Sequence, residues 1–171
     1  SPGSDSGWPI REGTFVIDPS QNMHNIYPLP VDDAQYNFTY PVAQYDHDEG
    51  TAIIGGFIYR GSAAPALQQT YIFGDVAKTG SSDGRIFYSD GTQILVLGLT
   101  ERDQPGFWVL GFGQDSDREL YVLGNTTGTP FDTTGAVYKL VPNARFDAAF
   151  LEIPAVDVLI DNDMSGVYRA H

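Results

Sequence analysis

The chain has 171 residues, of which 22 are Asp or Glu and nine are Lys or Arg, so its formal net charge is −13. This charge argues against a partner that is a nucleic acid or an anionic membrane surface, because both need a basic face. The absence of cysteine excludes disulfides, thiolate metal sites and a cysteine nucleophile. No apolar run approaches the roughly 20 residues that a membrane-spanning helix needs.

The first 45 residues form a compositional segment of their own. They are rich in proline and asparagine, and their one continuous apolar run is Gly13–Asp18. The aromatic side chains of this segment need a packing surface, so we interpret residues 1–45 as a long surface excursion rather than a linker. These aromatic residues are Trp8, Phe15, Tyr27, Tyr36, Phe38, Tyr40 and Tyr45.

From residue 13 to residue 141, short β-branched or aromatic runs alternate with glycine and proline breaks. Each run has the length of a strand and is bounded by turn residues. No stretch shows the sustained 3.6-residue periodicity of an amphipathic helix. We therefore predict an all-β fold of mostly antiparallel strands. The predicted strands are Gly13–Asp18, Thr51–Tyr59, Thr70–Gly74, Arg85–Tyr88, Gln93–Leu99, Gly106–Phe112, Glu119–Leu123 and Ala136–Val141.

Two pairs of these runs have the pattern of hairpins. Tyr71–Asp75 is followed by a loop and Gly84–Tyr88, and Phe107–Phe112 is followed by an acidic turn and Glu119–Leu123. Aspartates in such a turn hydrogen-bond their own backbone. Units of this size in succession predict a propeller or a sandwich.

Gly55 and Gly56 lie inside the apolar run Thr51–Tyr59. Glycine weakens a strand, so a pair of glycines there indicates a close approach of another backbone. We expect both positions to be crowded.

Three stretches in a fixed order carry a resemblance to a known family. They are Ser6–Gly13, Tyr45–Gly61 and Phe112–Leu123, with Tyr71–Asp75 and Gly84–Phe87 between the last two. Together they resemble the C-terminal half of glucose/sorbosone dehydrogenase-like proteins. This family of six-bladed β-propellers includes soluble quinoprotein sugar dehydrogenases and the Hedgehog-interacting protein.

The resemblance implies a specific architecture. Residues 1–142 would be C-terminal blades of a propeller, each an antiparallel four-stranded sheet, and residues 143–171 a tail or the start of another module. A partial ring leaves apolar blade faces open, so we expect the missing N-terminal half or further copies of the chain as partners. The resemblance also implies secretion, to an extracellular or periplasmic location.

Active members of the family bind pyrroloquinoline quinone (PQQ) and calcium, which implies the same cofactors here. The candidate cofactor-binding residues are His47, Asp48 and Thr51, because the first two precede, and Thr51 begins, the strand that in the family is innermost in its blade. The other interpretation of the acidic cluster Asp46–Glu49 is a solvated turn. The family's general base, a histidine, belongs to the N-terminal half and lies outside these residues.

Two short segments distinguish an active enzyme of this family from a non-catalytic binding protein. Active members clamp the quinone carboxylates with basic residues, but the matching positions here hold Ser81–Asp83 and Phe107–Val109. Two functions therefore stay open. One is part of a PQQ-dependent sugar dehydrogenase that is not catalytic alone, and the other is a non-catalytic extracellular β module that binds a glycan or protein or self-assembles.

The remaining candidates are short motifs. Asp161, Asp163 and Ser165 have the spacing of the first half of a calcium-binding loop, whereas the other interpretation is a polar turn. Asn37 and Asn125 begin glycosylation sequons.

Overall fold

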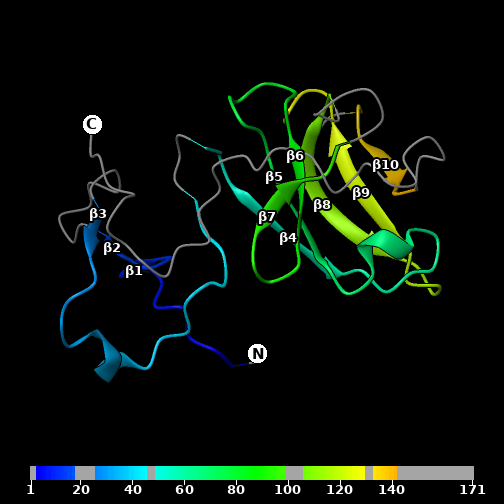
Figure 1. Cartoon of the computed structure of the whole chain (residues 1–171). Helices are drawn as coiled ribbons and strands as arrows, with labels where there is room; N and C mark the ends of the chain where they lie inside the picture. The colour runs from blue at the N-terminus through cyan, green and yellow to red at the C-terminus, as the bar shows by residue number, and fades with distance from the viewer. Residues whose placement is uncertain (1–2, 18–25, 46–48, 99–105, 130–132, 142–171) are drawn as a thin grey trace. The chain divides into compact units, whose positions relative to one another are not determined.

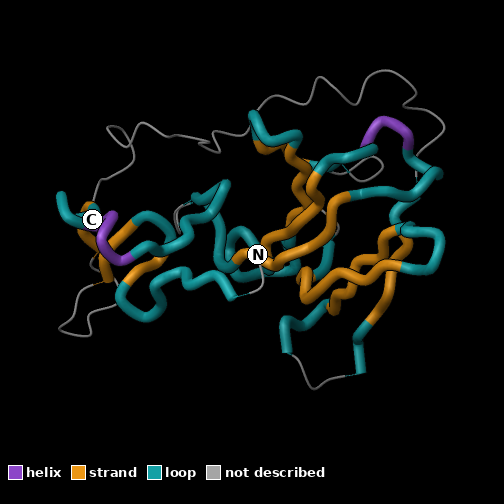
Figure 2. The backbone as a smooth tube through the Cα atoms, turned by 90° about the horizontal axis from the view of Figure 1, so that it is seen from below, coloured by secondary structure: helices purple, strands orange, loops and turns teal. Residues whose placement is uncertain are grey.

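Strands and loops make up almost all of the described backbone (Figure 2). The computed structural model describes residues 3–17, 26–45, 49–98, 106–129 and 133–141. Within them there is no α-helix, only 3-10 turns at Asp33–Tyr36 and Pro65–Leu67. None of the helical segments described could cross a membrane. The all-β prediction is confirmed. The chain divides between residues 44 and 45 into two units, which we describe separately.

The first unit contains a small antiparallel sheet. Its strands are β1 (Arg11–Glu12), β2 (Phe15–Ile17) and β3 (Ile26–Pro28), paired in the order β1-β2-β3. The sequence predicted one strand here, Gly13–Asp18, within a surface excursion. The difference arises because strands of two or three residues are too short to show an alternating pattern.

The buried Arg11 side chain organises the first unit. Its Nη2 atom lies 2.8 Å from Asp33 Oδ1, and the Tyr40 hydroxyl donates to the same carboxylate. The guanidinium also lies 5.4 Å from the centre of the Tyr36 ring and 5.5 Å from that of Phe38. Three of the aromatic residues that needed packing therefore contact one ion pair.

The second unit begins with a four-stranded antiparallel sheet (Figure 1). Its strands are β4 (Ile53–Ile58), β5 (Tyr71–Asp75), β6 (Arg85–Ser89) and β7 (Ile94–Val96), and each pairs with the next along the chain. The predicted hairpin of residues 71–75 and 84–88 is confirmed by the β5–β6 pairing, which places Phe73 opposite Phe87. This order is that of a propeller blade.

A second antiparallel sheet follows. It consists of β8 (Trp108–Gln114), β9 (Leu120–Asn125) and β10 (Ala136–Lys139), and the β8–β9 pairing confirms the second predicted hairpin. The described residues supply three strands where a complete blade has four. β8 lies beside β4 and β5, so the first strands of the two sheets are neighbours.

The two sheets share one core. It joins fully buried side chains of the first sheet to those of the second, as neighbouring blades do. Ile72 and Ile86 contribute from the first sheet, and Val109, Leu120 and Val122 from the second. Each of these five residues is at most 3% exposed.

The two glycines of β4 have different surroundings. A Cβ atom at Gly56 would lie 1.9 Å from the Ile72 carbonyl oxygen, so only glycine allows this approach. A Cβ atom at Gly55 would meet nothing nearer than the Tyr71 hydroxyl, at 3.9 Å. Crowding is therefore confirmed at Gly56 and wrong at Gly55, because the register shifts between Ile54 and Phe57 and only one glycine faces β5.

This difference yields a matched pair of substitutions. We expect Gly56→Ala to lower the free energy of unfolding by about 1–3 kcal/mol or more, because backbone atoms cannot move aside as a flexible side chain can. Gly55→Ala should change it by less than about 1 kcal/mol. Urea unfolding of both variants measures the difference, and equal midpoints would contradict the steric argument.

Candidate functional site

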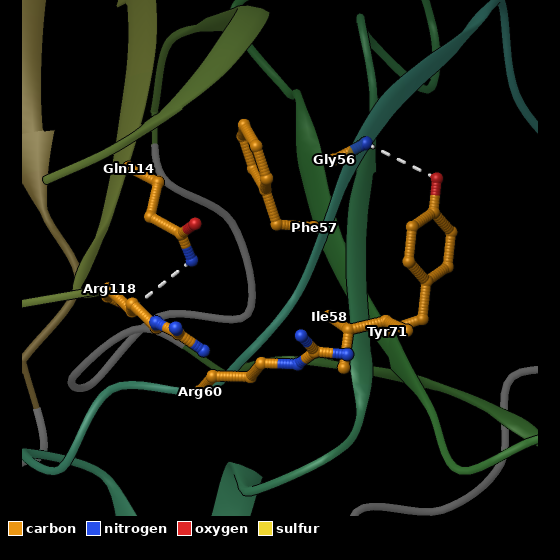
Figure 3. A pocket seen from close by; sticks show the side chains of 7 residues that line it. All are labelled: Gly56, Phe57, Ile58, Arg60, Tyr71, Gln114 and Arg118. Carbon is orange, nitrogen blue, oxygen red and sulfur yellow. Dashed lines mark hydrogen bonds between the residues drawn. The ribbon is translucent and has the colours of Figure 1, made fainter. Parts of the chain in front are cut away.

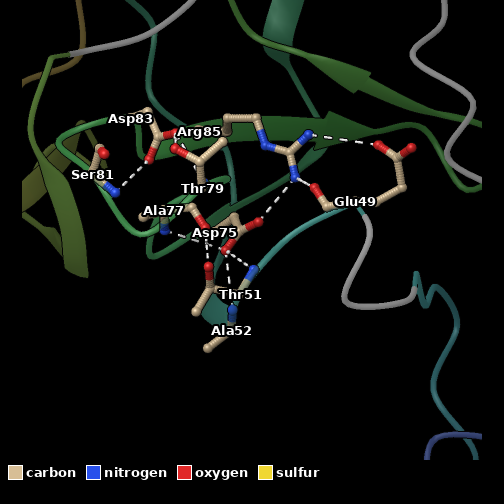
Figure 4. A network of polar contacts seen from close by, with 9 residues as sticks. All are labelled: Glu49, Thr51, Ala52, Asp75, Ala77, Thr79, Ser81, Asp83 and Arg85. Atoms are coloured by element: carbon tan, nitrogen blue, oxygen red, sulfur yellow. Dashed lines mark hydrogen bonds and ion pairs between the residues drawn. The ribbon is translucent and has the colours of Figure 1, made fainter. Parts of the chain in front are cut away.

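A buried carboxylate, that of Asp75, fixes the chain where it enters β4 (Figure 4). Its Oδ1 atom accepts hydrogen bonds from the backbone N–H groups of Thr51 and Ala52, both at 3.1 Å, and of Ala77 at 3.3 Å. Its Oδ2 atom lies 2.9 Å from Arg85 Nη2. Asp75 is completely buried and Arg85 nearly so, which makes this a desolvated ion pair with several additional donors.

The Asp75 network engages one of the predicted cofactor residues. The Thr51 backbone donates to Asp75, and its hydroxyl donates to the Ala77 carbonyl oxygen. Neither donor is free to bind a cofactor in this arrangement. His47 and Asp48, the other two candidates, lie outside the described residues.

Arg85 also binds the segment just before β4. It donates to the Glu49 carbonyl oxygen, and its Nη1 atom lies 4.0 Å from Glu49 Oε2. Tyr45 packs near the same guanidinium, and burial together with the Asp75 charge raises the pKa of its hydroxyl. These contacts attach the acidic cluster's C-terminal end to the sheet.

A second buried carboxylate, that of Glu119, holds the loop after β4. It accepts hydrogen bonds from the Tyr59 hydroxyl at 2.7 Å and from the backbone N–H groups of Ser62 and Ala63 at 2.8 and 2.9 Å. The Tyr59 hydroxyl in turn accepts from the Ala64 N–H at 2.8 Å. The Tyr59 bond is the main cause that lowers the pKa of Glu119, whereas burial raises the pKa of Tyr59 to about 12.

The positions that match the family's quinone clamp provide no cation. Asp83 accepts hydrogen bonds from the Thr79 and Ser81 N–H groups at 2.8 and 3.3 Å, which closes a turn before β6. Phe107 is 5% exposed and stacks on Tyr138 with ring centres 4.5 Å apart. A tricarboxylate such as PQQ needs positive charge at these positions, so the residues present do not suit it.

An open groove lies at the opposite end of β4 and β8 (Figure 3). It has a volume of about 620 Å³. Two arginines, one carboxamide and two aromatic rings line it, together with the end of β4. The lining residues are Gly56, Phe57, Ile58, Arg60, Tyr71, Gln114 and Arg118.

The two arginines of the groove are exposed and make no ion pair with any described residue. By contrast, Arg11, Arg85 and Lys139 each pair with an aspartate. Two unpaired guanidiniums on one groove of a chain with a net charge of −13 make it a local site of positive charge. The sequence analysis missed this site, because Arg60 and Arg118 are 58 positions apart and no motif contains both.

Hydrogen bonds hold the backbone segments that carry these two arginines. Tyr59 precedes Arg60 and Glu119 follows Arg118, so the Tyr59–Glu119 bond ties the two arginine-bearing segments together. The β8–β9 turn is closed by Asp115, which accepts from the N–H groups of Asp117 and Glu119 at 3.0 and 2.9 Å. The backbone that carries the two arginines is thus held in place before any ligand binds.

The other candidates are less informative. Asp161, Asp163 and Ser165 lie outside the described residues, and within those residues no cluster of three metal-ligating side chains occurs. Asn37 is exposed, whereas Asn125 is 3% exposed, donates to the Thr129 carbonyl oxygen and accepts from the Gly128 N–H. In the folded chain only the sequon at Asn37 is accessible.

Comparison with known proteins finds partial similarity to the Hedgehog-interacting protein. The mouse Hedgehog-interacting protein is 29% identical over 99 residues, and the human protein is 30% identical over 100 residues. Each match covers 54% of this chain but only 14% of the relative. No protein-family model matches the chain. The similarity supports the resemblance in its coarser form and adds no match to a sugar dehydrogenase.

The Tyr59 hydroxyl provides a test of the Glu119 network. Tyr59→Phe should lower the free energy of unfolding by about 1–3 kcal/mol, since it leaves the buried Ala64 N–H without an acceptor and removes one of the three donors to the Glu119 carboxylate. Tyr138→Phe is the matched control, because the Tyr138 hydroxyl is half-exposed and makes no hydrogen bond to a described residue. Thermal and urea unfolding measure both variants, and equal losses would contradict the assignment.

The lowered pKa values of Glu119 and Asp115 predict acid sensitivity. A carboxylate whose pKa is lower in the folded than in the unfolded state stabilises the fold at neutral pH. As pH falls, the unfolded chain binds protons before the folded chain does, and this stabilisation is lost. The loss should begin as pH falls through the ordinary values of 4.5 for Glu119 and 3.8 for Asp115. Melting temperatures between pH 3 and pH 7 should fall less steeply in Glu119→Gln than in the wild type; parallel curves would refute this role.

Proposed function

We propose that this chain is part of a secreted β-propeller that acts by binding a ligand rather than by oxidising a sugar. The observation that carries this proposal is the groove lined by Arg60 and Arg118, two arginines that form no ion pair with any described residue. It lies at one end of β4 and β8, whereas the positions matching the quinone clamp lie at the other end and lack cations.

The register of the strands supports this separation of the two ends. Ile53, at the start of β4, pairs with Asp75, which pairs with Arg85. The Val109 N–H donates to the Val76 carbonyl oxygen, so the start of β8 lies at that same end. The groove is lined instead by the second half of β4 and the last residue of β8, Gln114.

The similarity to the Hedgehog-interacting protein supports a binding function. By its name, the Hedgehog-interacting protein is a protein that interacts with another protein. The matched stretch covers only 14% of that relative, so its interaction cannot be transferred directly to this chain. We include binding of a Hedgehog-type protein by this chain as part of our proposal.

Cofactor and ligand binding can be compared directly. After incubation with PQQ and calcium, the chain should elute from gel filtration without quinone absorbance, because its clamp positions hold no cation. An immobilised Hedgehog protein should retain the chain in a surface-binding assay. Quinone absorbance that co-elutes in a stoichiometric amount would contradict the proposal and favour the dehydrogenase alternative.

The outer face of the second sheet is a candidate contact surface for another propeller blade. Leu123 and Val137 are cross-strand neighbours on this face, and they are 38% and 66% exposed. Val122 and Leu120 occupy the opposite, buried face. Because blades of a propeller pack face to face, we propose that another blade covers Leu123 and Val137, from the rest of the protein or from a second copy.

From the exposure of Leu123 and Val137 on this face we expect the isolated chain to associate. At low micromolar concentration the chain should sediment as more than a monomer, and added salt should favour association because it screens the charge of −13. Val137→Glu should shift the distribution toward the monomer, whereas Val31→Glu, an exposed valine in the first unit, should not. A single species at 18.7 kDa for the wild type would contradict the open-face proposal.

A further inference from the structure

We propose that the groove between Arg60 and Arg118 binds an acidic saccharide, one that carries a carboxylate or a sulfate group. This inference rests on the proposed binding function and names the class of its ligand. The three features that support it are the chemistry of the lining, the size of the groove and the state of the β4 edge.

The lining combines the groups that recognise a charged sugar. A guanidinium offers a planar pair of donors that matches the oxygens of a carboxylate or sulfate, and the groove has two. Figure 3 shows both arginine side chains at the groove together with Phe57 and Gln114, whose carboxamide donates a hydrogen bond to the Arg118 carbonyl oxygen at 3.3 Å. The Phe57 ring supplies an apolar surface for the C–H face of a sugar, and the Gln114 carboxamide can hydrogen-bond to hydroxyl groups.

The size of the groove is suited to a small ligand. Its volume of about 620 Å³ lies within the range of roughly 300–1,000 Å³ that small-molecule sites occupy. No acidic side chain is among its lining residues. Glu119 follows Arg118 in the sequence, but its carboxylate is bound by Tyr59 and by backbone N–H groups and pairs with neither guanidinium.

The edge of β4 disfavours an extended peptide as the ligand. A peptide that adds to a sheet needs a regular row of free backbone N–H and C=O groups. Here the register shifts between Ile54 and Phe57, and the Gly56 N–H already donates to the Tyr71 hydroxyl at 3.2 Å. Side-chain groups therefore dominate the binding chemistry of this groove.

The test is a calorimetric titration of the full 171-residue chain with four probes. They are a sulfated heparin-derived disaccharide, a galacturonic acid trisaccharide, a neutral cellotriose and a peptide of consecutive glutamates. We expect one or both acidic saccharides to bind with a dissociation constant below about 1 mM, more weakly at high salt. The first two probes show whether sulfate or carboxylate is preferred. The neutral sugar and the peptide should bind at least tenfold more weakly.

Matched variants assign the binding to the groove. Arg60→Gln and Arg118→Gln should each weaken binding at least tenfold, and Arg60→Lys should weaken it several-fold because the charge stays but the planar pair of donors is lost. Lys78→Gln removes the same charge from an exposed side chain near the opposite strand end and should leave binding unchanged. Unchanged melting temperatures in all four variants confirm that folding is not affected.

Three results would overturn the proposal. They are no binding of either acidic saccharide, equal binding of cellotriose or the acidic peptide, and equal weakening by Lys78→Gln and Arg60→Gln. If the saccharides fail while the Hedgehog protein still binds and no quinone is retained, only the ligand class is wrong. Retained quinone would instead refute the proposed function itself.

Discussion

The hydrogen bond between the Tyr59 hydroxyl and the Glu119 carboxylate is the contact on which the candidate site depends. It joins the end of the first sheet's inner strand to the start of β9, 60 residues later in the chain. Both groups are buried, so a carboxylate without these donors would be strongly destabilising in this position. Since Tyr59 and Glu119 are the direct neighbours of Arg60 and Arg118, the same bond holds together the two backbone segments that carry these arginines.

The Asp75 carboxylate has the same role at the other end of β4, where it binds the backbone of a loop. Each carboxylate accepts hydrogen bonds from backbone N–H groups of a loop that has no regular partners, and each lies against a glycine, Gly50 for Asp75 and Gly61 for Glu119. The two ends differ in what remains for a ligand. At the Asp75 end the nearest cation, Arg85, is buried in the ion pair, whereas both arginines at the Glu119 end stay exposed.

The sequence predicted the strands and hairpins of the second unit because those runs are long, apolar and bounded by turn residues. It failed where geometry rather than composition decides. Gly55 and Gly56 are indistinguishable in sequence, and only the register shift beside β5 makes one of them crowded. The sheet of the first unit was missed because its strands are too short for a pattern. The arginine groove was missed because its residues meet only through the packing of β4 beside β8.

The motifs that carry the family resemblance consist largely of residues that maintain the fold. In the described structure Gly56 allows the approach of β5, Asp115 closes the β8–β9 turn, and Glu119 holds the loop after β4. A motif made of such residues transmits the architecture of a propeller without transmitting its chemistry. The family resemblance would place a quinone clamp between the motifs, at Ser81–Asp83 and Phe107–Val109, and these positions hold no Lys or Arg. For this reason the function is better inferred from where free charge lies on the folded chain than from the order of its motifs.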